Sequence, residues 1–189
     1  TLVLGLLANW LAAGLALCGL LYYVLVYSCW LKRSTPSNIV IGGAAGAVPP
    51  LVGWAAVTGE VSLLAVYLFA VIFFWTPPHF WALALLIGRE YEKARIPMLP
   101  IVKGEAETRH QILMYSLWLV AFTLLVVVVQ QVGVFYFVAA GVLGGLFLYH
   151  AVRLLREATA VAARRLFRYS ILYLALLFAA LVVDRWKIT

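Results

Sequence analysis

From Leu11 to Leu31 the chain reads LAAGLALCGLLYYVLVYSCWL, 21 residues without a charged side chain. A helix needs about 20 predominantly apolar residues to cross the hydrocarbon core of a bilayer. A strand of a membrane β-barrel would alternate apolar and polar residues, whereas this stretch is apolar on both alternations. Residues 11–31 are therefore predicted to form a transmembrane helix.

The rest of the chain repeats this pattern. Of its 189 residues, 66% are hydrophobic and only 11% are charged, whereas a soluble domain carries about 25% charged residues. A soluble globular fold is therefore excluded. We predict an all-α, polytopic transmembrane helical bundle of about six full spans plus the end of another, with the full spans at residues 11–31, 39–57, 61–87, 111–130, 134–152 and 169–183, after the end of an earlier span at residues 1–7.

The basic residues lie almost entirely on one side of this layout. If successive connections alternate between the two sides, 12 of the 14 Lys and Arg fall on one side, with Arg185 and Lys187 on the other. Basic residues near span ends favour the cytoplasm. We therefore expect a multi-pass protein of the cell inner (cytoplasmic) membrane whose active face is cytoplasmic. The net charge of +7 suits an anionic ligand or anionic lipid headgroups, and we expect no nucleic-acid partner.

Residues 74–84, FWTPPHFWALA, place the ionisable His79 inside an apolar run. Intramembrane ionisable groups usually face the bundle interior or a cavity, and a proline frees a backbone carbonyl that needs a partner. Two interpretations stay open: His79 binds a ligand, or it hydrogen-bonds a freed carbonyl and holds an expected kink at Pro77-Pro78. The aromatic side chains around it could likewise form a ligand pocket or pack at the membrane interface: Trp75, Phe80 and Trp81.

Residues 88–110 form the longest polar connection and mix acids with bases. On a helix, Arg89 and Lys93 would share a face, and Glu92 could pair with Arg89 or Arg95. A solvated surface held by such ion pairs is one interpretation. The other is a site where carboxylates hold Mg²⁺ while bases bind a polyphosphate. The spacing of the residues leaves both open.

Three motifs occur in order within a resemblance that covers nearly the whole chain: NIVIGGAAGAVPP at residues 38–50, WTPPHFWALA at residues 75–84, and Tyr91 followed by IPMLPIV at residues 96–102. Together they resemble the protohaem IX farnesyltransferase (haem O synthase) family of the UbiA-type intramembrane prenyltransferase superfamily. The resemblance implies a nine-span domain. This chain, residues 1–189, would be an N-terminally truncated form, holding the end of the third span and spans four to nine, the C-terminal two-thirds of that single domain.

The resemblance also implies an activity. Family members transfer a farnesyl group from farnesyl diphosphate to a vinyl group of haem b, with addition of water, to give haem O for terminal oxidases. The implied cofactor is Mg²⁺, and the implied substrates are farnesyl diphosphate and haem b. Membrane lipid surrounds the protein, and haem A synthase or oxidase assembly factors are candidate partners.

Residue roles follow partly from the positions that match the family and partly from the charge and chemistry of the side chains. Glu90, Arg89 and Lys93 are the candidate catalytic residues, and Glu90 and Glu92 are the candidate metal ligands, because they stand at the family's second acidic motif. The candidate substrate-binding residues are His79, Trp75, Phe80, Trp81, Tyr91, Arg95, Lys103, Lys32 and Arg33. His110 and His150, at the cytoplasmic boundary, compete with His79 as a contact to haem.

The chain departs from the family pattern at three places. Glu90 stands where the family usually has Asp, Arg95 stands where it usually has a small residue, and the family's first acidic motif has no counterpart here. Two other functions remain open. Another prenyltransferase of this superfamily would act on a quinone or chlorin precursor, and a transporter or structural membrane subunit would more often carry mid-membrane charges in several spans, whereas here only His79 is well inside one.

Overall fold

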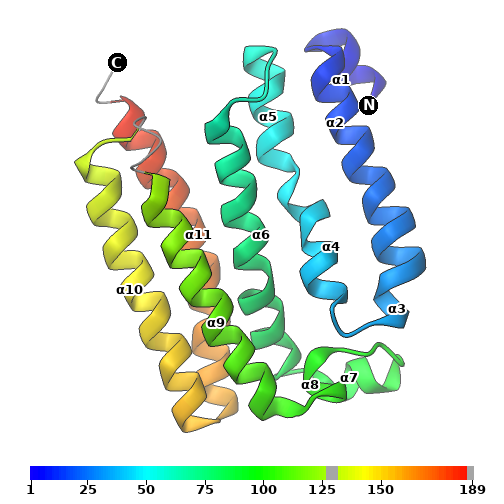
Figure 1. The fold of residues 1–189 in the computed structure, drawn as a ribbon, viewed down its shortest axis with the longest axis vertical. Helices are drawn as coiled ribbons and strands as arrows, with labels where there is room; N and C mark the ends of the chain where they lie inside the picture. The colour runs from blue at the N-terminus through cyan, green and yellow to red at the C-terminus, as the bar shows by residue number, and fades with distance from the viewer. Residues whose placement is uncertain (127–131, 187–189) are drawn as a thin grey trace.

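The computed structural model describes residues 1–126 and 132–186, and all regular structure in these ranges is helical. The helices are α1 (Leu2–Leu7), α2 (Trp10–Leu21), the π-helix η1 (Tyr22–Leu31), α3 (Lys32–Ser34), α4 (Asn38–Ala47), α5 (Pro49–Thr58), α6 (Leu63–Ala84), α7 (Gly88–Lys93), α8 (Leu99–Val102), α9 (Gly104–Leu125), α10 (Val134–Glu157) and α11 (Ala160–Trp186). The long helices run side by side along one axis, and the short α7 and α8 lie across one end of the bundle (Figure 1).

Five helical segments are long and apolar enough to cross a membrane. They are Trp10–Ser34, Asn38–Thr58, Leu63–Ala84, Val134–Glu157 and Ala160–Arg185. The prediction of a polytopic helical bundle is therefore confirmed. The remaining predicted span, residues 111–130, corresponds to α9, which begins earlier, at Gly104, and whose predicted C-terminal end lies outside the described residues.

Prolines have different effects in two of these segments. Pro49 is the first residue of α5, directly after α4 has ended, a position where the missing N–H costs no hydrogen bond. In contrast, α6 runs without interruption through Pro77 and Pro78. The span is therefore not broken at the proline pair, and the expected kink there stays a prediction. Helices α4, α9 and α11 pack around α6, and this packing supports helical geometry where two intrahelical hydrogen bonds are missing.

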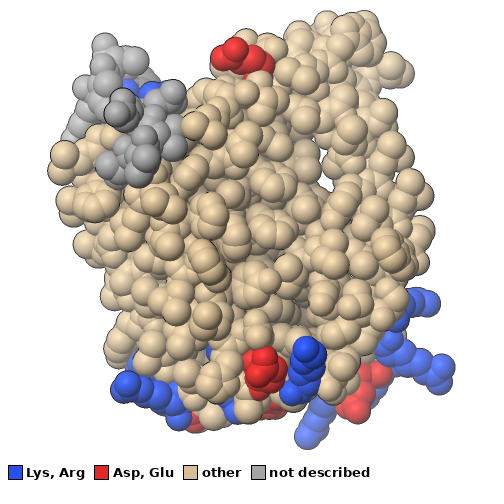
Figure 2. All heavy atoms as spheres, in the orientation of Figure 1, with Lys and Arg blue, Asp and Glu red and all other residues tan. Residues whose placement is uncertain are grey.

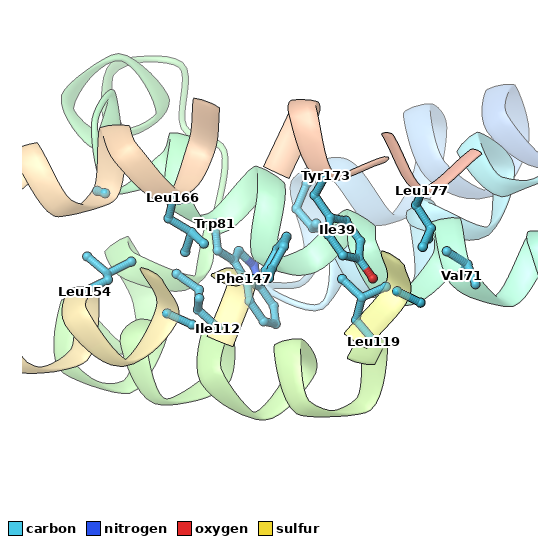
Figure 3. Close-up of a cluster of buried hydrophobic side chains, with 14 of the residues drawn as sticks. Ile39, Val71, Trp81, Ile112, Leu119, Phe147, Leu154, Leu166, Tyr173 and Leu177 are labelled. Atoms are coloured by element: carbon cyan, nitrogen blue, oxygen red, sulfur yellow. The ribbon is translucent and has the colours of Figure 1, made fainter. Parts of the chain in front are cut away.

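The apolar core lies between α6, α9, α10 and α11. Its largest members include Phe147 and Tyr173, whose rings pack edge to face with their centroids 5.0 Å apart (Figure 3). The hydroxyl of Tyr173 donates a hydrogen bond to Thr123 Oγ1 at 3.3 Å, so the buried phenol has a partner. This packing fixes α6 against the C-terminal helices and leaves its other face turned toward α4.

The charged residues are concentrated at one end of the bundle. In Figure 2 most Lys, Arg, Asp and Glu side chains gather at the end that carries α7 and α8, while the middle of this face shows neither sign of charge. This separation agrees with the predicted clustering of the basic residues on one side of the membrane.

Candidate functional site

A polar cleft of about 530 Å³ opens at the charged end of the bundle. It is formed where α6 ends, α7 and α8 cross the bundle, and α9 begins. Its lining residues are Ala84, Leu85, Leu86, Gly88, Arg89, Glu90, Glu92, Pro100, Ile101 and Glu105. The cleft thus contains one of the predicted bases and both predicted metal ligands, together with Glu105, which the sequence did not single out.

The charges of α7 face water rather than one another. Arg89, Glu90, Glu92 and Lys93 are all exposed. Within the described ranges, ion pairs join Arg109 to Glu105 and Arg153 to Glu157, and no pair involves α7. The possible pairing of Glu92 with Arg89 or Arg95 is therefore not made. These side chains remain available to an anionic ligand and its counter-ion.

An apolar groove of about 380 Å³ lies between η1, α4 and α6. Its lining residues are Tyr23, Tyr27, Ile39, Gly42, Gly43, Ala45, Gly46, Ile72, Trp75, Thr76 and Phe80. Two of these, Trp75 and Phe80, are predicted substrate-binding residues. The sequence did not single out the tyrosines, because their approach to α4 depends on the π-helical backbone of η1.

The groove depends on glycines at two close approaches. A Cβ atom at Gly42 would lie 2.2 Å from a ring carbon of Tyr27, and one at Gly43 would lie 3.0 Å from the methyl group of Thr76. Tyr27 also stacks on Tyr23, with ring centroids 5.4 Å apart. The missing side chains therefore let η1 and α6 come close to α4.

One face of α6 connects the groove with the cleft. Ile72, Thr76 and Phe80 line the groove, and Ala84, four residues further on, lines the polar cleft. Residues spaced by four lie on the same face of a helix. Phe80 and Ala84 are about 6 Å apart along the axis. The two spaces are therefore neighbours on one helix face, an arrangement that suits an elongated ligand with an anionic head and an apolar tail.

His79 lies on another side of α6, against α11. Its Nδ1 is 2.7 Å from Ser170 Oγ, and its ring stacks between Trp75 and Phe167, with centroids 4.3 Å and 4.7 Å away. The interpretation that His79 holds a carbonyl freed by Pro77-Pro78 is wrong, because its hydrogen bond goes to α11. Contact of His79 with a ligand stays a prediction: the residue stands behind the wall formed by Trp75 and does not line the groove.

Trp81 does not line the apolar groove with Trp75 and Phe80. It is buried, meets Tyr115 edge to face at 5.3 Å, and has an indole N–H without a hydrogen-bond partner among the described residues. It lines a smaller cavity of about 150 Å³, to which Lys103 and Gln111 also contribute. The structure therefore brings Lys103 near Trp81 and leaves both outside the groove.

The remaining candidates lie around the charged end. Arg33 is exposed on α3, and the carbonyl of Lys32 accepts a hydrogen bond from Asn38 Nδ2 at 3.3 Å. Arg95 follows α7 with a φ of 55°, in the left-handed region. Tyr91 is half-buried, and burial raises the pKa of its phenol above the usual value. Of the competing histidines, His110 is exposed and His150 is half-buried.

The carboxylates only partly fit a magnesium ion. No group of three His, Cys, Asp or Glu in residues 1–126 and 132–186 is placed to hold a metal. Glu90, Glu92 and Glu105 nevertheless line one cleft, and carboxylate oxygen is the ligand type that Mg²⁺ prefers. These residues could therefore supply part of a coordination shell, which a bound diphosphate and water would have to complete.

Comparison with known proteins places the chain in a family. Residues 1–182 match the UbiA prenyltransferase family. The chain belongs to this family. The apolar segments described above and membership of the UbiA family together make it an integral membrane protein. A solved structure described as digeranylgeranylglyceryl phosphate synthase has the same fold, with a TM-score of 0.81 at 21% identity, over 98% of this chain and 65% of that one.

Curated relatives in the UbiA family are more similar in sequence. The protoheme IX farnesyltransferase of Roseiflexus sp. is 55% identical over 97% of this chain and 34% of that protein. Proteins of the same name from Synechococcus sp. and Erythrobacter litoralis are 56% and 51% identical, over 98% and 97% of this chain and 57% and 62% of their own lengths. The chain thus spans about a third to three-fifths of these relatives.

Proposed function

We propose that this chain is part of a protohaem IX farnesyltransferase, which moves a farnesyl group from farnesyl diphosphate to a vinyl group of haem b, with addition of water, to form haem O. The identity of 50–57% to relatives of that name supports the choice of substrates. The observation that carries the proposal is that the apolar groove and the polar cleft adjoin each other on one face of α6. A prenyl diphosphate likewise has an apolar tail joined to an anionic head.

The polar cleft would bind the diphosphate. Arg89 lines it, and Lys93 lies one turn further along α7. Both bases can stabilise the negative charge that builds on the leaving oxygens as the C–O bond weakens. When bound, Mg²⁺ would neutralise part of the same charge, with Glu90 and Glu92 among its oxygen ligands.

The apolar groove would hold the prenyl tail. Its walls are mainly aromatic and aliphatic, with Trp75 and Phe80 on α6 facing Tyr23 and Tyr27 on η1. Such a surface keeps water from an allylic carbocation, and aromatic faces stabilise positive charge. Transfer to the acceptor is thereby favoured over hydrolysis.

The haem would meet the same end of the bundle. We infer that its propionates contact basic residues at the cytoplasmic face, with Lys32, Arg33, Arg95 and Lys103 as candidates, and that its ring lies among the helices within reach of His79. The inner membrane as location and haem A synthase or oxidase assembly factors as partners belong to the same proposal.

The test is pigment analysis of the full-length protein in lipid nanodiscs supplied with haem b, farnesyl diphosphate and Mg²⁺. We expect haem O to accumulate and to depend on all three additions. Prenylation of a quinone or chlorin precursor, with haem b unchanged, would assign the protein to another acceptor. If no prenylated product forms with any of these acceptors, the proposed prenyl transfer is rejected.

A further inference from the structure

Ser170 is a buried hydroxyl residue at the meeting of α6 and α11. Its relative exposure is 0%. Its carbonyl oxygen accepts a hydrogen bond from Trp75 Nε1 at 2.8 Å, and its Oγ lies 2.7 Å from His79 Nδ1. The same Oγ lies 2.6 Å from the carbonyl oxygen of Phe167, one turn earlier on α11. One serine therefore contacts two of the predicted substrate-binding residues.

The protons in this cluster can be placed by elimination. A serine hydroxyl has one proton to donate, and a backbone carbonyl can only accept. The short contact between Ser170 Oγ and the Phe167 carbonyl is favourable only if the hydroxyl donates to it, since otherwise two oxygen lone pairs would face each other. The hydroxyl proton is then unavailable to His79, so His79 Nδ1 must be the donor and Ser170 Oγ its acceptor.

This assignment determines the other ring nitrogen of His79. A neutral imidazole carries one N–H, so a proton on Nδ1 leaves a lone pair on Nε2. The hydrogen bonds found in the described part of the chain include none to Nε2. A neutral His79 held in this way can accept a proton or bind a metal through Nε2, but it cannot donate a hydrogen bond from that atom.

The orientation of the ring is also fixed. Trp75 and Phe167 stack on its two faces with interplanar angles of 17° and 22°, and Phe80 meets it edge to face at 5.3 Å. Trp75 is in turn held by the Ser170 carbonyl. Rotation of the imidazole by half a turn would break the bond to Ser170, so the tautomer and the ring position are coupled.

We propose that Ser170 is a positioning residue that holds His79 as the Nδ1–H tautomer, so that any contact of the ring with a ligand would be made by the lone pair on Nε2. The inference rests on the proposed function in one respect, the identity of that ligand. Of the two haem contacts open to His79, it favours the iron ligand and disfavours a hydrogen-bond donor near the reacting edge. Such use of one imidazole nitrogen to define the other is common at metal sites.

The decisive measurement is nitrogen NMR of the full-length protein in nanodiscs, with ¹⁵N-labelled histidine at a pH where His79 is neutral. Subtracting the spectrum of His79→Gln assigns the residue. We expect the proton on Nδ1 in the parent protein. Ser170→Ala should move it to Nε2, the tautomer that an unconstrained imidazole prefers, while Ser170→Thr, which keeps the hydroxyl, should retain it on Nδ1. Finding the Nε2–H tautomer in the parent overturns the proposal, and this result does not depend on whether the Ser170 variants fold.

Ser116→Ala is the matched control. Ser116 is equally buried, and its Oγ donates to the carbonyl of Ile112 at 2.6 Å rather than contacting a histidine. It should leave the His79 signals unchanged. If Ser170→Ala also leaves them unchanged, Ser170 does not set the tautomer and the proposal fails.

Haem titration of the same variants separates this inference from the proposed function. Loss of a His79-dependent band in the haem absorption spectrum, in both His79→Gln and Ser170→Ala, supports both. An unchanged haem spectrum together with the expected NMR result keeps the tautomer assignment and rejects haem as the ligand of His79. Absence of haem O formation, with the NMR result intact, rejects the proposed acceptor alone.

Discussion

The carboxylate of Asp184, near the end of α11, accepts a hydrogen bond from the backbone N–H of Tyr136 at 3.1 Å and another from that of Gly133. The first N–H groups of a helix have no partner within the helix. Asp184, on a neighbouring helix, supplies an acceptor for these groups at the start of α10, and its side chain is itself buried, with a relative exposure of 3%. A single acidic side chain thus joins the start of α10 to the last helix at the end of the bundle remote from α7.

Replacing Asp184 should destabilise the protein. In Asp184→Ala the two N–H groups lose their acceptor in a buried setting, which costs about 1–3 kcal/mol for each unsatisfied group. We expect a lower midpoint of thermal unfolding in detergent and a smaller effect from Asp184→Asn, which keeps one acceptor oxygen. Glu60→Ala removes an exposed acid and should have little effect. Equal midpoints for Asp184→Ala and Glu60→Ala would show that the cap does not contribute to stability.

Gly42→Ala should disturb the apolar groove. The new methyl group would lie 2.2 Å from the Tyr27 ring, so the ring or η1 has to move. Overpacking of this kind typically costs about 1–3 kcal/mol. We expect reduced formation of haem O and an increased KM for farnesyl diphosphate, measured by pigment analysis over a range of prenyl donor.

The control for this substitution lies on the same helix. Gly46 also lines the groove, but a Cβ atom there would meet nothing within 4 Å. Gly46→Ala should therefore have nearly the parent KM. If the two alanine variants behave alike, the close approach of Tyr27 to α4 is not needed for donor binding.

The spans could be predicted from the sequence because the length of an apolar run is a local property. The helix that contains most of the predicted span 111–130 begins before it, at Gly104, and hydropathy does not reveal this start because the first two turns of α9 are polar. The sequence does contain a signal for this helix start. Glu105 and Glu107 lie in the first turn of α9, where acidic side chains interact favourably with the helix dipole.

The arrangement around His79 could not be predicted in the same way. Ser170 is 91 positions away in the sequence, and nothing in the local pattern of either residue indicates the other. The contact of Tyr27 with Gly42 likewise depends on the π-helical turn of η1, which hydropathy does not reveal. The polar residues of α7 were found from sequence because they are contiguous, whereas the groove is assembled from three separate helices.

The expected topology can be tested by labelling single cysteines in the protein with Cys18 and Cys29 replaced by Ala. Ser37, Glu105 and Thr159 are exposed at the charged end and Glu60 is exposed at the opposite end. Because basic residues favour the cytoplasm, the first three should react only with reagent added from the cytoplasmic side, and Glu60→Cys only from the other. Reaction of Glu60→Cys and Glu105→Cys from the same side would contradict the layout.

The role of Glu90 can be tested by a substitution that keeps shape and removes charge. Glu90→Gln should lower turnover by roughly 10²–10³-fold, since a charge that stabilises the leaving group through Mg²⁺ is lost, while binding of haem b should persist. Glu90→Asp, which keeps a carboxylate, should retain activity. Pigment analysis at limiting Mg²⁺ provides the measurement, and chelation of Mg²⁺ should abolish the parent activity.

Glu157→Gln is the control for this test, because Glu157 is an acid at the same end whose carboxylate pairs with Arg153 rather than lining the polar cleft. It should keep nearly the parent turnover at every Mg²⁺ concentration. The loss of turnover in Glu90→Gln should also become larger as the Mg²⁺ concentration is lowered, because a site with one ligand fewer releases the ion at a higher concentration than the parent site does. A Glu90→Gln enzyme as active as Glu157→Gln at limiting Mg²⁺ would make Glu90 a surface charge and remove the metal role from α7.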